Sequence, residues 1–219
     1  VFQQLDKDDR VNVVILRGEG RMFTAGLDLR AAITTLQGEG LEDKSKAEQN
    51  VYFFKLVRAW QGHFDQLRRC KKPVIAAVHG QCIGGGIDLI TSADIRVCTR
   101  DAQFSIKETA IGLVADLGTL QRISKLCSPG LAREMAFSSI SASAERVFRA
   151  GLVNEVYENV DEMLENVRKL AVVIASQSPL VVQGTKYVMN YADEHGVEDG
   201  LLHVALWNSA FLKSDDLTE

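Results

Sequence analysis

Three consecutive glycines stand directly before an aspartate in the segment GQCIGGGIDLI, residues 80–90. They follow an apolar strand pattern that ends at Val78 and come before an apolar pattern with helical spacing. Glycine at such a junction lets the chain turn sharply and leaves backbone N–H groups uncovered at the helix N-terminus. Such N–H groups favour negative charge. The segment predicts either a site for a developing anion or, more simply, a tight turn with Asp88 in the first helical turn.

A second segment of the same character, RMFTAGLDLRAA, lies at residues 21–32. Small residues precede the apolar Leu27, and Asp28 is best interpreted as the N-cap of a following helix. The backbone N–H of Leu27 is the group of chemical interest. Two strand-to-helix turns that each offer one N–H group could together form a two-donor oxyanion hole.

Other motifs with a known chemistry are not supported by the sequence. No G-x-x-x-x-G-K-[ST] is present, and no G-x-G-x-x-G stands in the right frame, so a phosphate-binding loop is disfavoured. His79 and Cys82 form an H-x-x-C pair without a second pair at ligand spacing, which favours a packed histidine over a metal site. The absence of G-x-S-x-G gives no support to a serine hydrolase.

Composition indicates an ordinary globular protein. Of 219 residues, 46% are hydrophobic and 25% charged, and the net charge is -4 with the two signs well mixed. Phosphate contacts need clustered lysine and arginine, so nucleic acid is not the expected partner. No apolar run reaches the roughly 18 residues of a membrane span. Four scattered cysteines predict no disulfide framework, and we expect a soluble, intracellular protein.

Short apolar segments separated by helical patterns predict an α/β arrangement with a partly parallel sheet. The expected strands lie at residues 11–18, 72–80, 94–99, 102–108 and 152–157. A long amphipathic helix is expected over residues 48–70. About three further helices are expected after Asn159, at residues 161–177, from Pro179 onward and at 197–212, forming a helical layer on the α/β core.

Three longer segments together resemble the enoyl-CoA hydratase/isomerase (crotonase) superfamily: FTAGLDL, HGQCIGGGIDLITSADIRVCT and FSIKETAIGLVADLGTLQRI. The resemblance extends over essentially the whole chain. It implies an α/β fold with a (ββα)n spiral core and a C-terminal helical layer. The acyl-CoA-binding core would span residues 1–158 and an oligomerisation region residues 159–219. Family members have further residues before this start, so the chain is expected to begin part-way into the fold.

The resemblance also implies the binding groups. Members of this superfamily hold the thioester oxygen of an acyl-CoA between two backbone N–H groups, which match Leu27 and Gly85 here. The remaining expected substrate contacts are Ala25, Gly26, Gly84 and Arg30, the last of these through CoA phosphates. No metal and no cofactor is expected, because CoA is part of the substrate.

The carboxyl groups distinguish branches of the superfamily. Hydratases carry Glu at the positions of Asp88 and Glu108 and Gly at the position of Asp116, whereas this chain reads Asp, Glu, Asp. The pattern resembles the Δ3,5-Δ2,4-dienoyl-CoA isomerases of fatty-acid β-oxidation. This implies that Glu108 removes the C2 proton, that Asp116 returns one at C6, and that Asp88 hydrogen-bonds within the cluster and tunes the others.

Two alternative functions stay open from the sequence. One is a 2-enoyl-CoA hydratase or another crotonase-fold acyl-CoA enzyme. The other is a non-catalytic RNA-binding relative, which the net charge and the absence of basic runs disfavour. The resemblance further implies a homotrimer or homohexamer built through the apolar C-terminal helices, which include Trp207 and Phe211, and a location in the peroxisome or the mitochondrion.

Overall fold

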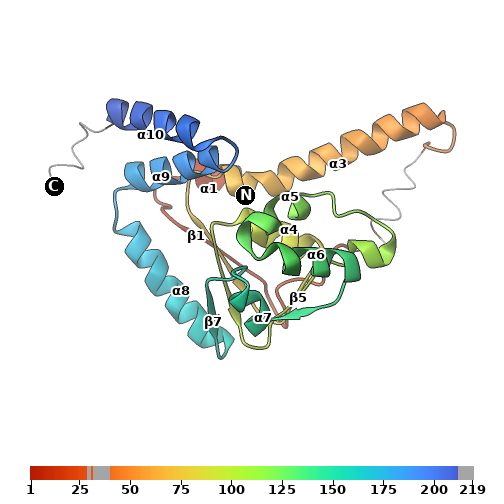
Figure 1. Ribbon diagram of the computed structural model, residues 1–219, viewed down its shortest axis with the longest axis horizontal. Helices are drawn as coiled ribbons and strands as arrows, with labels where there is room; N and C mark the ends of the chain where they lie inside the picture. Colours follow the sequence, from red (N-terminus) through yellow and green to blue (C-terminus); the bar gives the residue numbers. More distant parts are fainter. Residues whose placement is uncertain (29–30, 32–39, 212–219) are drawn as a thin grey trace.

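The computed structural model describes residues 1–28, 31 and 40–211, which fold as two small sheets covered by helices (Figure 1). The elements of the described chain follow in the order α1 (Phe2–Lys7), β1 (Val14–Arg17), α3 (Lys46–Arg69), β2 (Val74–Val78), β3 (Gln81–Ile83), α4 (Gly85–Ser92), β4 (Ile95–Thr99), β5 (Gln103–Ser105), the 3-10 helix η1 (Glu108–Ile111), α5 (Thr119–Leu126), α6 (Pro129–Ser138), β6 (Ala142–Ser143), α7 (Ala144–Arg149), β7 (Glu155–Tyr157), α8 (Val160–Ala175), α9 (Pro179–Ala192) and α10 (Val197–Phe211).

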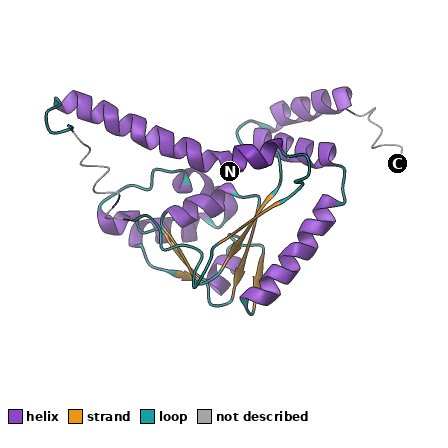
Figure 2. Cartoon of the chain, turned by 180° about the vertical axis from the view of Figure 1, so that it is seen from behind, coloured by secondary structure: helices purple, strands orange, loops and turns teal. Residues whose placement is uncertain are grey.

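The chain winds as a spiral that contributes one strand to each sheet per turn. The larger sheet is fully parallel with the order β1-β2-β4-β7, and the smaller one has the order β3-β5-β6. One turn runs β2, β3 and α4, and the next runs β4, β5 and η1. The predicted α/β class and the ββα spiral are confirmed. Seen from behind, the strands lie between α8 on one side and the remaining core helices on the other (Figure 2).

Strand β2 is buried along its whole length because both faces of the larger sheet are covered. Ile75 and Ala77 belong to a cluster with three residues of α8, namely Met163, Leu164 and Val167. The alternate residues of β2 belong to the main core together with the buried side chains of α4. Burial on both faces explains why the sequence of this strand is continuously apolar rather than alternating.

The five predicted strands are all present but shorter than predicted, and one of them ends three residues early. The segment expected as a strand over residues 102–108 is extended only from Gln103 to Ser105. Its parallel partner β3 has three residues, and the backbone N–H of Gly84 makes the next bond, to the Ser105 carbonyl at 2.9 Å. Beyond this point β5 has no strand to pair with, so Glu108 begins a 3-10 helix instead.

Several short elements were not predicted. Strands β3 and β6 have only three and two residues, which is too short for a recognisable alternation. The helices α5, α6 and α7 fill residues 119–149, a stretch to which the sequence analysis assigned no element. Strands β3 and β6 belong to the smaller sheet, so most of that sheet was not predicted.

The predicted helix over residues 48–70 is α3, which begins with a capping box. The Ser45 hydroxyl accepts from the Glu48 N–H at 3.4 Å, and the Glu48 carboxylate accepts from the Ser45 N–H at 2.9 Å. The first half of α3 extends beyond the rest of the described chain (Figure 1). Its apolar stripe is therefore covered only toward the end, where Leu67 is buried, while Val51 and Phe54 are 52% and 66% exposed.

The three helices expected after Asn159 are α8, α9 and α10. Helix α9 begins at Pro179 as predicted, with Ser178 as its N-cap. Lys186 of α9 is buried, and its ammonium group donates to the Asp94 carboxylate at 2.7 Å and to the Lys72 carbonyl at 3.0 Å. Helix α10 packs on α9. In the part of the chain that the structure describes, no helix is both long and apolar enough to cross a membrane.

We expect the Lys186 ion pair to fasten α9 to the core. Lys186→Met should lower the free energy of unfolding by about 2–4 kcal/mol, because Asp94 then keeps its charge without the buried cation. Chemical denaturation measures this change. Lys169→Met is the control, since Lys169 pairs with Glu165 on the exposed face of α8 and its loss should cost at most about 0.5 kcal/mol. Equal effects of the two substitutions would contradict this assignment.

Candidate active site

The two glycine-containing segments lie side by side. Thr24 forms a parallel bridge with Cys82 of β3. The Thr24 N–H donates to the Gln81 carbonyl at 2.9 Å, and the Ile83 N–H donates to the Thr24 carbonyl at 3.3 Å. This bridge places Thr24 at the edge of the smaller sheet, beside β3. It brings the stretch that leads to Leu27 next to the stretch that leads to Gly85.

Leu27 and Gly85 each present a backbone N–H group that has no acceptor among the described residues. Gly85 is the first residue of α4, where an N–H group lacks an intrahelical partner by geometry. The next part of the helix is closed by the Ile87 N–H, which donates to the Gly84 carbonyl at 2.7 Å. The Leu27 side chain is 53% exposed. Both donors predicted for an oxyanion hole are thus available on adjacent segments.

Two of the three consecutive glycines are required by the backbone or by packing, and the middle one is not. Gly84 has a φ of 53°, and a Cβ at this position would lie 3.2 Å from Glu108 Oε1. A Cβ at Gly86 would lie 2.4 Å from Thr24 Cγ2, which no side chain tolerates. A Cβ at Gly85 would make only an ordinary contact with Phe64 Cζ at 3.7 Å. Nothing in this chain therefore demands glycine at position 85.

The other predicted substrate contacts lie around the same turn. The Gly26 N–H donates to the Thr24 hydroxyl at 3.1 Å, and a Cβ at Gly26 would lie 3.1 Å from the Ile83 carbonyl oxygen. Ala25 stands between Thr24 and Gly26 in this paired stretch. Asp28 Oδ1 accepts from the Ala31 N–H at 3.1 Å, which is the bond expected of an N-cap. Arg30 lies outside the described residues.

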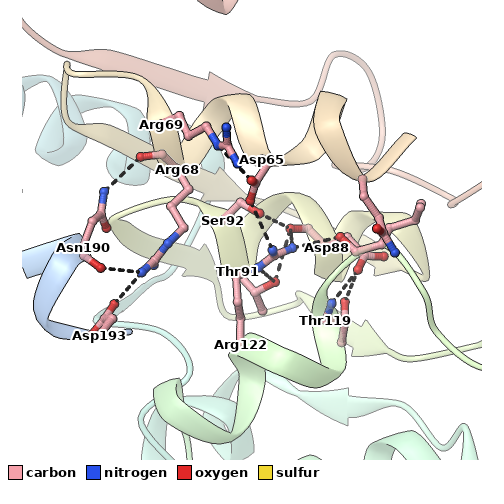
Figure 3. Close-up of polar contacts among 12 residues, drawn as sticks. Asp65, Arg68, Arg69, Asp88, Thr91, Ser92, Thr119, Arg122, Asn190 and Asp193 are labelled. Atoms are coloured by element: carbon pink, nitrogen blue, oxygen red, sulfur yellow. Dashed lines mark hydrogen bonds and ion pairs between the residues drawn. The ribbon is translucent and has the colours of Figure 1, made fainter. Parts of the chain in front are cut away.

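Asp88 is buried, with 1% of its surface exposed, and its carboxylate anchors another helix. Asp88 Oδ1 accepts from both the backbone N–H and the hydroxyl of Thr119, each at 2.7 Å (Figure 3). Thr119 is the first residue of α5, whose own N-cap, Gly118, has no side chain to offer. Asp88 therefore caps α5 from α4. It does not hydrogen-bond to Glu108 or Asp116, in contrast to the sequence-based expectation.

Arg122 of α5 contacts the backbone of α4 and of the loop before α5. Its guanidinium group donates to the Asp88 carbonyl at 3.3 Å and to the Leu117 carbonyl at 3.1 Å. It also lies 4.0 Å from the carboxylate of Asp65 in α3 (Figure 3). Burial raises the pKa of Asp88, and the Thr119 bonds and the nearby Arg122 charge oppose that rise. Arg122 thus connects α3 and α4 to the backbone at Leu117, next to Asp116.

Glu108 has the features expected of a proton acceptor. It is half-buried at the start of η1, and its Oε1 is directed at Gly84 of the glycine run. Its Oε2 is buried and has no hydrogen-bond partner within the described chain. Burial raises the pKa of Glu108, and the negative charges of Asp88 and Asp116 raise it further. A carboxylate in this setting holds a proton more readily than an ordinary glutamate.

Asp116 lies on the loop between η1 and α5 and is more exposed than the other two carboxyl groups. Partial burial raises its pKa. Its charge in turn raises the pKa values of both Glu108 and Asp88. The structure therefore brings the three predicted carboxyl groups into one electrostatic cluster at the end of α4 that carries the glycines. Interacting groups of this kind titrate as a coupled set.

The residues that hold this cluster in place were not predicted from the sequence, namely Gln61, Thr119 and Arg122. Thr119 and Arg122 stand in the segment GTLQRI, where a threonine at a helix start was an available signal. Gln61 donates its side-chain N–H to the Asp116 carbonyl at 2.6 Å across 55 residues of sequence. No local pattern points to such a contact.

The H-x-x-C pair is packed rather than poised to bind a metal. The His79 ring nitrogen Nε2 lies 3.0 Å from the Gly20 carbonyl oxygen, and Cys82 is fully buried behind Gly86. All four cysteines are buried free thiols. Across residues 1–28, 31 and 40–211, no group of three or more potential ligand side chains is placed to hold a metal ion.

Comparison with known proteins identifies similar chains. The family model described as enoyl-CoA hydratase/isomerase matches residues 1–214. The chain is 48% identical over 219 residues to the mitochondrial Δ(3,5)-Δ(2,4)-dienoyl-CoA isomerase of Dictyostelium discoideum, covering 100% of this chain and 74% of that protein. It is 41% identical to the mitochondrial protein of the same name from Homo sapiens and 43% identical to the peroxisomal one from Arabidopsis thaliana. Each alignment covers 100% of this chain, and the relatives are covered to 66% and 78%.

Solved structures share the fold. A putative enoyl-CoA hydratase from Streptomyces coelicolor superposes with a TM-score of 0.88 at 25% identity, covering 100% of this chain and 76% of that one. An enoyl-CoA hydratase subunit from Geobacillus kaustophilus superposes with a TM-score of 0.84 at 27% identity, with coverage of 100% and 79%.

The coupling between the carboxyl groups can be tested in the protein without substrate. Asp88→Asn should lower the pKa of Glu108, because the neighbouring negative charge that raises it is gone. The fold should persist, since the amide oxygen of asparagine can still accept both bonds from Thr119. NMR titration of labelled glutamate carboxyl carbons measures the shift. Asp8→Asn, which changes an exposed aspartate paired with Arg10, is the control and should leave Glu108 unchanged. A Glu108 titration that is identical in all three proteins would contradict the cluster.

Proposed function

This chain belongs to the enoyl-CoA hydratase/isomerase family, and on that premise we propose that it isomerises 3,5-dienoyl-CoA to 2,4-dienoyl-CoA. The names of the relatives from Dictyostelium, human and Arabidopsis support this reaction. The same names place those relatives in the mitochondrion or the peroxisome. We assign this chain to one of these two compartments and to fatty-acid β-oxidation.

In the proposed complex the thioester oxygen lies between the N–H groups of Leu27 and Gly85. Removing a proton next to a thioester leaves an enolate, whose negative oxygen is stabilised by fixed donors better than by mobile water. The free N–H groups on the two adjacent segments support this assignment. So does the glycine at position 85, which packing does not explain and which keeps the approach to its N–H clear. Ala25, Gly26 and Gly84 form the surrounding backbone, and Arg30 is proposed to contact the CoA phosphates.

The observation that carries the proposal is the buried, unpartnered Glu108 Oε2 beside the glycine run. In the proposed mechanism this oxygen takes the proton from C2, and the electron pair of the broken C–H bond moves into a conjugated enolate. The electron pair is delocalised along the conjugated acyl group to C6, where Asp116 donates a proton. The two double bonds move from positions 3 and 5 to positions 2 and 4, and no atom is gained or lost. Glu108 ends protonated and Asp116 ionised.

Two carboxyl groups with raised pKa values suit a reaction in which one accepts a proton and the other donates one. The reaction needs one ionised base and one protonated acid at the same time, and mutual repulsion of like charges favours that state over two ionised groups. Burial and the nearby charges act in this direction for Glu108, and partial burial does so for Asp116. We propose that Asp88 contributes its charge and the capped position of α5. The CoA belongs to the substrate, and the proposed steps use no further cofactor.

We also propose that residues 1–158 bind the acyl-CoA and residues 159–219 join copies of the chain into a homotrimer or homohexamer. The support is the apolar surface that α8, α9 and α10 leave exposed in the single chain. Its larger members are Val172, Val173, Val181, Met189, Leu201, Leu202 and Leu206. Exposed apolar side chains in this number favour a contact with another protein surface. Trp207 packs on Gly184 within the hairpin, and Phe211 is 40% exposed.

The reaction is tested by separating its two proton transfers. Purified protein with 3,5-dienoyl-CoA should generate the absorbance of the conjugated 2,4-dienoyl product. Asp116→Asn should lower turnover by roughly 10²–10⁴-fold, the usual contribution of a positioned acid or base, while exchange of the C2 proton with deuterated water survives. Glu108→Gln should abolish C2 exchange together with turnover.

Two results would contradict this assignment. An Asp116→Asn protein that isomerises at the wild-type rate would remove Asp116 from the reaction. Wild-type protein that hydrates a 2-enoyl-CoA but leaves the 3,5-dienoyl-CoA unchanged would replace the isomerase by a hydratase.

The oligomer is tested by hydrodynamics. Sedimentation of the wild-type chain at micromolar concentration should give a trimer or hexamer, and Leu202→Glu together with Leu206→Glu should shift the distribution toward monomer. These charges would be buried without partners in an interface but solvated in a monomer. Lys55→Glu, at an exposed position of α3 outside residues 159–219, makes the same change in net charge and is the control. A wild-type monomer at this concentration would rule out the proposed assembly.

A further inference from the structure

The loop that carries Asp116 is held by hydrogen bonds more than by burial. Its apolar residues Leu113 and Val114 are exposed, and Ala115 is buried. Three side chains from three helices hold the following backbone at nearly successive positions. Gln61 of α3 bonds to the carbonyl of residue 116, Arg122 of α5 to that of residue 117, and Asp88 of α4 to the N–H of residue 119.

Gln61 is the member of this set that contacts Asp116 itself. Its Nε2 donates to the Asp116 carbonyl oxygen at 2.6 Å, while its Oε1 accepts from the Arg58 guanidinium at 2.6 Å. Arginine can only donate and a carbonyl can only accept, so the amide has a single orientation that satisfies both neighbours. Arg58 thereby fixes which end of the Gln61 amide faces the loop. The contact is made by a side chain on α3, outside the spiral turn to which the loop belongs.

We propose that Gln61, oriented by Arg58, is a positioning residue that holds Asp116 within reach of C6 of the substrate. The inference rests on the proposed function, because it concerns the second proton transfer of that reaction. Asp116 is exposed on the loop, so its carboxyl group lies where the backbone places it, and Gln61 holds that backbone at the Asp116 carbonyl. Glu108 is positioned differently, at the start of η1 and beside Gly84, and the side chain of Gln61 bonds to Arg58 and Asp116 instead.

The two proton transfers should therefore respond differently to loss of this bond. Gln61→Met keeps the length of the side chain but removes the N–H donor. It should lower turnover and C6 protonation by about 10- to 100-fold, because a catalytic group displaced by about 1 Å loses reactivity on that scale. KM and the C2 exchange with deuterated water should stay at wild-type values. Gln61→Glu, which keeps the bond to Arg58 but cannot donate to the Asp116 carbonyl, should give the same pattern.

Gln66→Met is the matched control. Gln66 lies on the same helix, and its side chain makes no hydrogen bond to the rest of the described chain, so its substitution should leave both proton transfers unchanged. Equal C6 protonation in wild type and Gln61→Met would overturn the inference. A parallel fall of C2 exchange and C6 protonation would also overturn it, since that result indicates a general disturbance. If wild-type protein itself fails to isomerise the substrate, the proposed function fails instead, and the two outcomes are distinguished by the wild-type reaction.

Discussion

The hydrogen bonds of the Asp88 carboxylate satisfy two requirements of the fold at once, and the arrangement of the site depends on them. A buried charge is costly unless it is hydrogen-bonded, and the N-terminus of α5 needs an acceptor that Gly118 does not provide. One oxygen of Asp88 satisfies both needs through Thr119. Because Asp88 is also in the first turn of α4, this bond fixes α4 and α5 relative to each other. The free N–H of Gly85 and the Asp116 loop are placed at the two ends of that connection.

The same bond limits what Asp88 can do chemically. Asp88 Oδ1 already accepts two short hydrogen bonds, whereas Glu108 Oε2 is buried and has no hydrogen-bond partner among the described residues. The three carboxyl groups thus lie in different surroundings, although their residue types are nearly the same. Burial raises the pKa of each, and hydrogen bonds oppose that rise, for Asp88 those from the hydroxyl and the backbone N–H of Thr119. We propose that these surroundings, more than residue identity, separate the acid, the base and the anchor.

Much of this could be predicted from the sequence, for reasons that particular residues illustrate. Strand β2 is buried on both faces, so five apolar residues in a row were sufficient to identify it. Pro179 after Ser178 marked the start of α9 through local chemistry alone. Strand β3 was missed because three residues cannot show a period, and β5 was predicted too long because its end is set by the length of its partner.

The candidate site, too, has a part that local sequence predicts and a part that it does not. The glycines and carboxyl groups stand in contiguous segments whose spacing carries a signal. The bonds that orient them, from Thr119 to Asp88 and from Gln61 to Asp116, join residues 31 and 55 positions apart. Such contacts exist only once the helices are packed, and no pattern within a single segment predicts them.

The four buried thiols have a consequence for the chemical durability of the protein. A conjugated dienoyl thioester is an electrophile that adds to thiolates, and Cys82 lies directly behind the glycine run. Burial raises the pKa of Cys82 and Cys127, and it raises that of Cys98 to about 12. Thiols in this state are almost entirely protonated at neutral pH and are poor nucleophiles. A catalyst with such cysteines can release a reactive product many times without being alkylated by it.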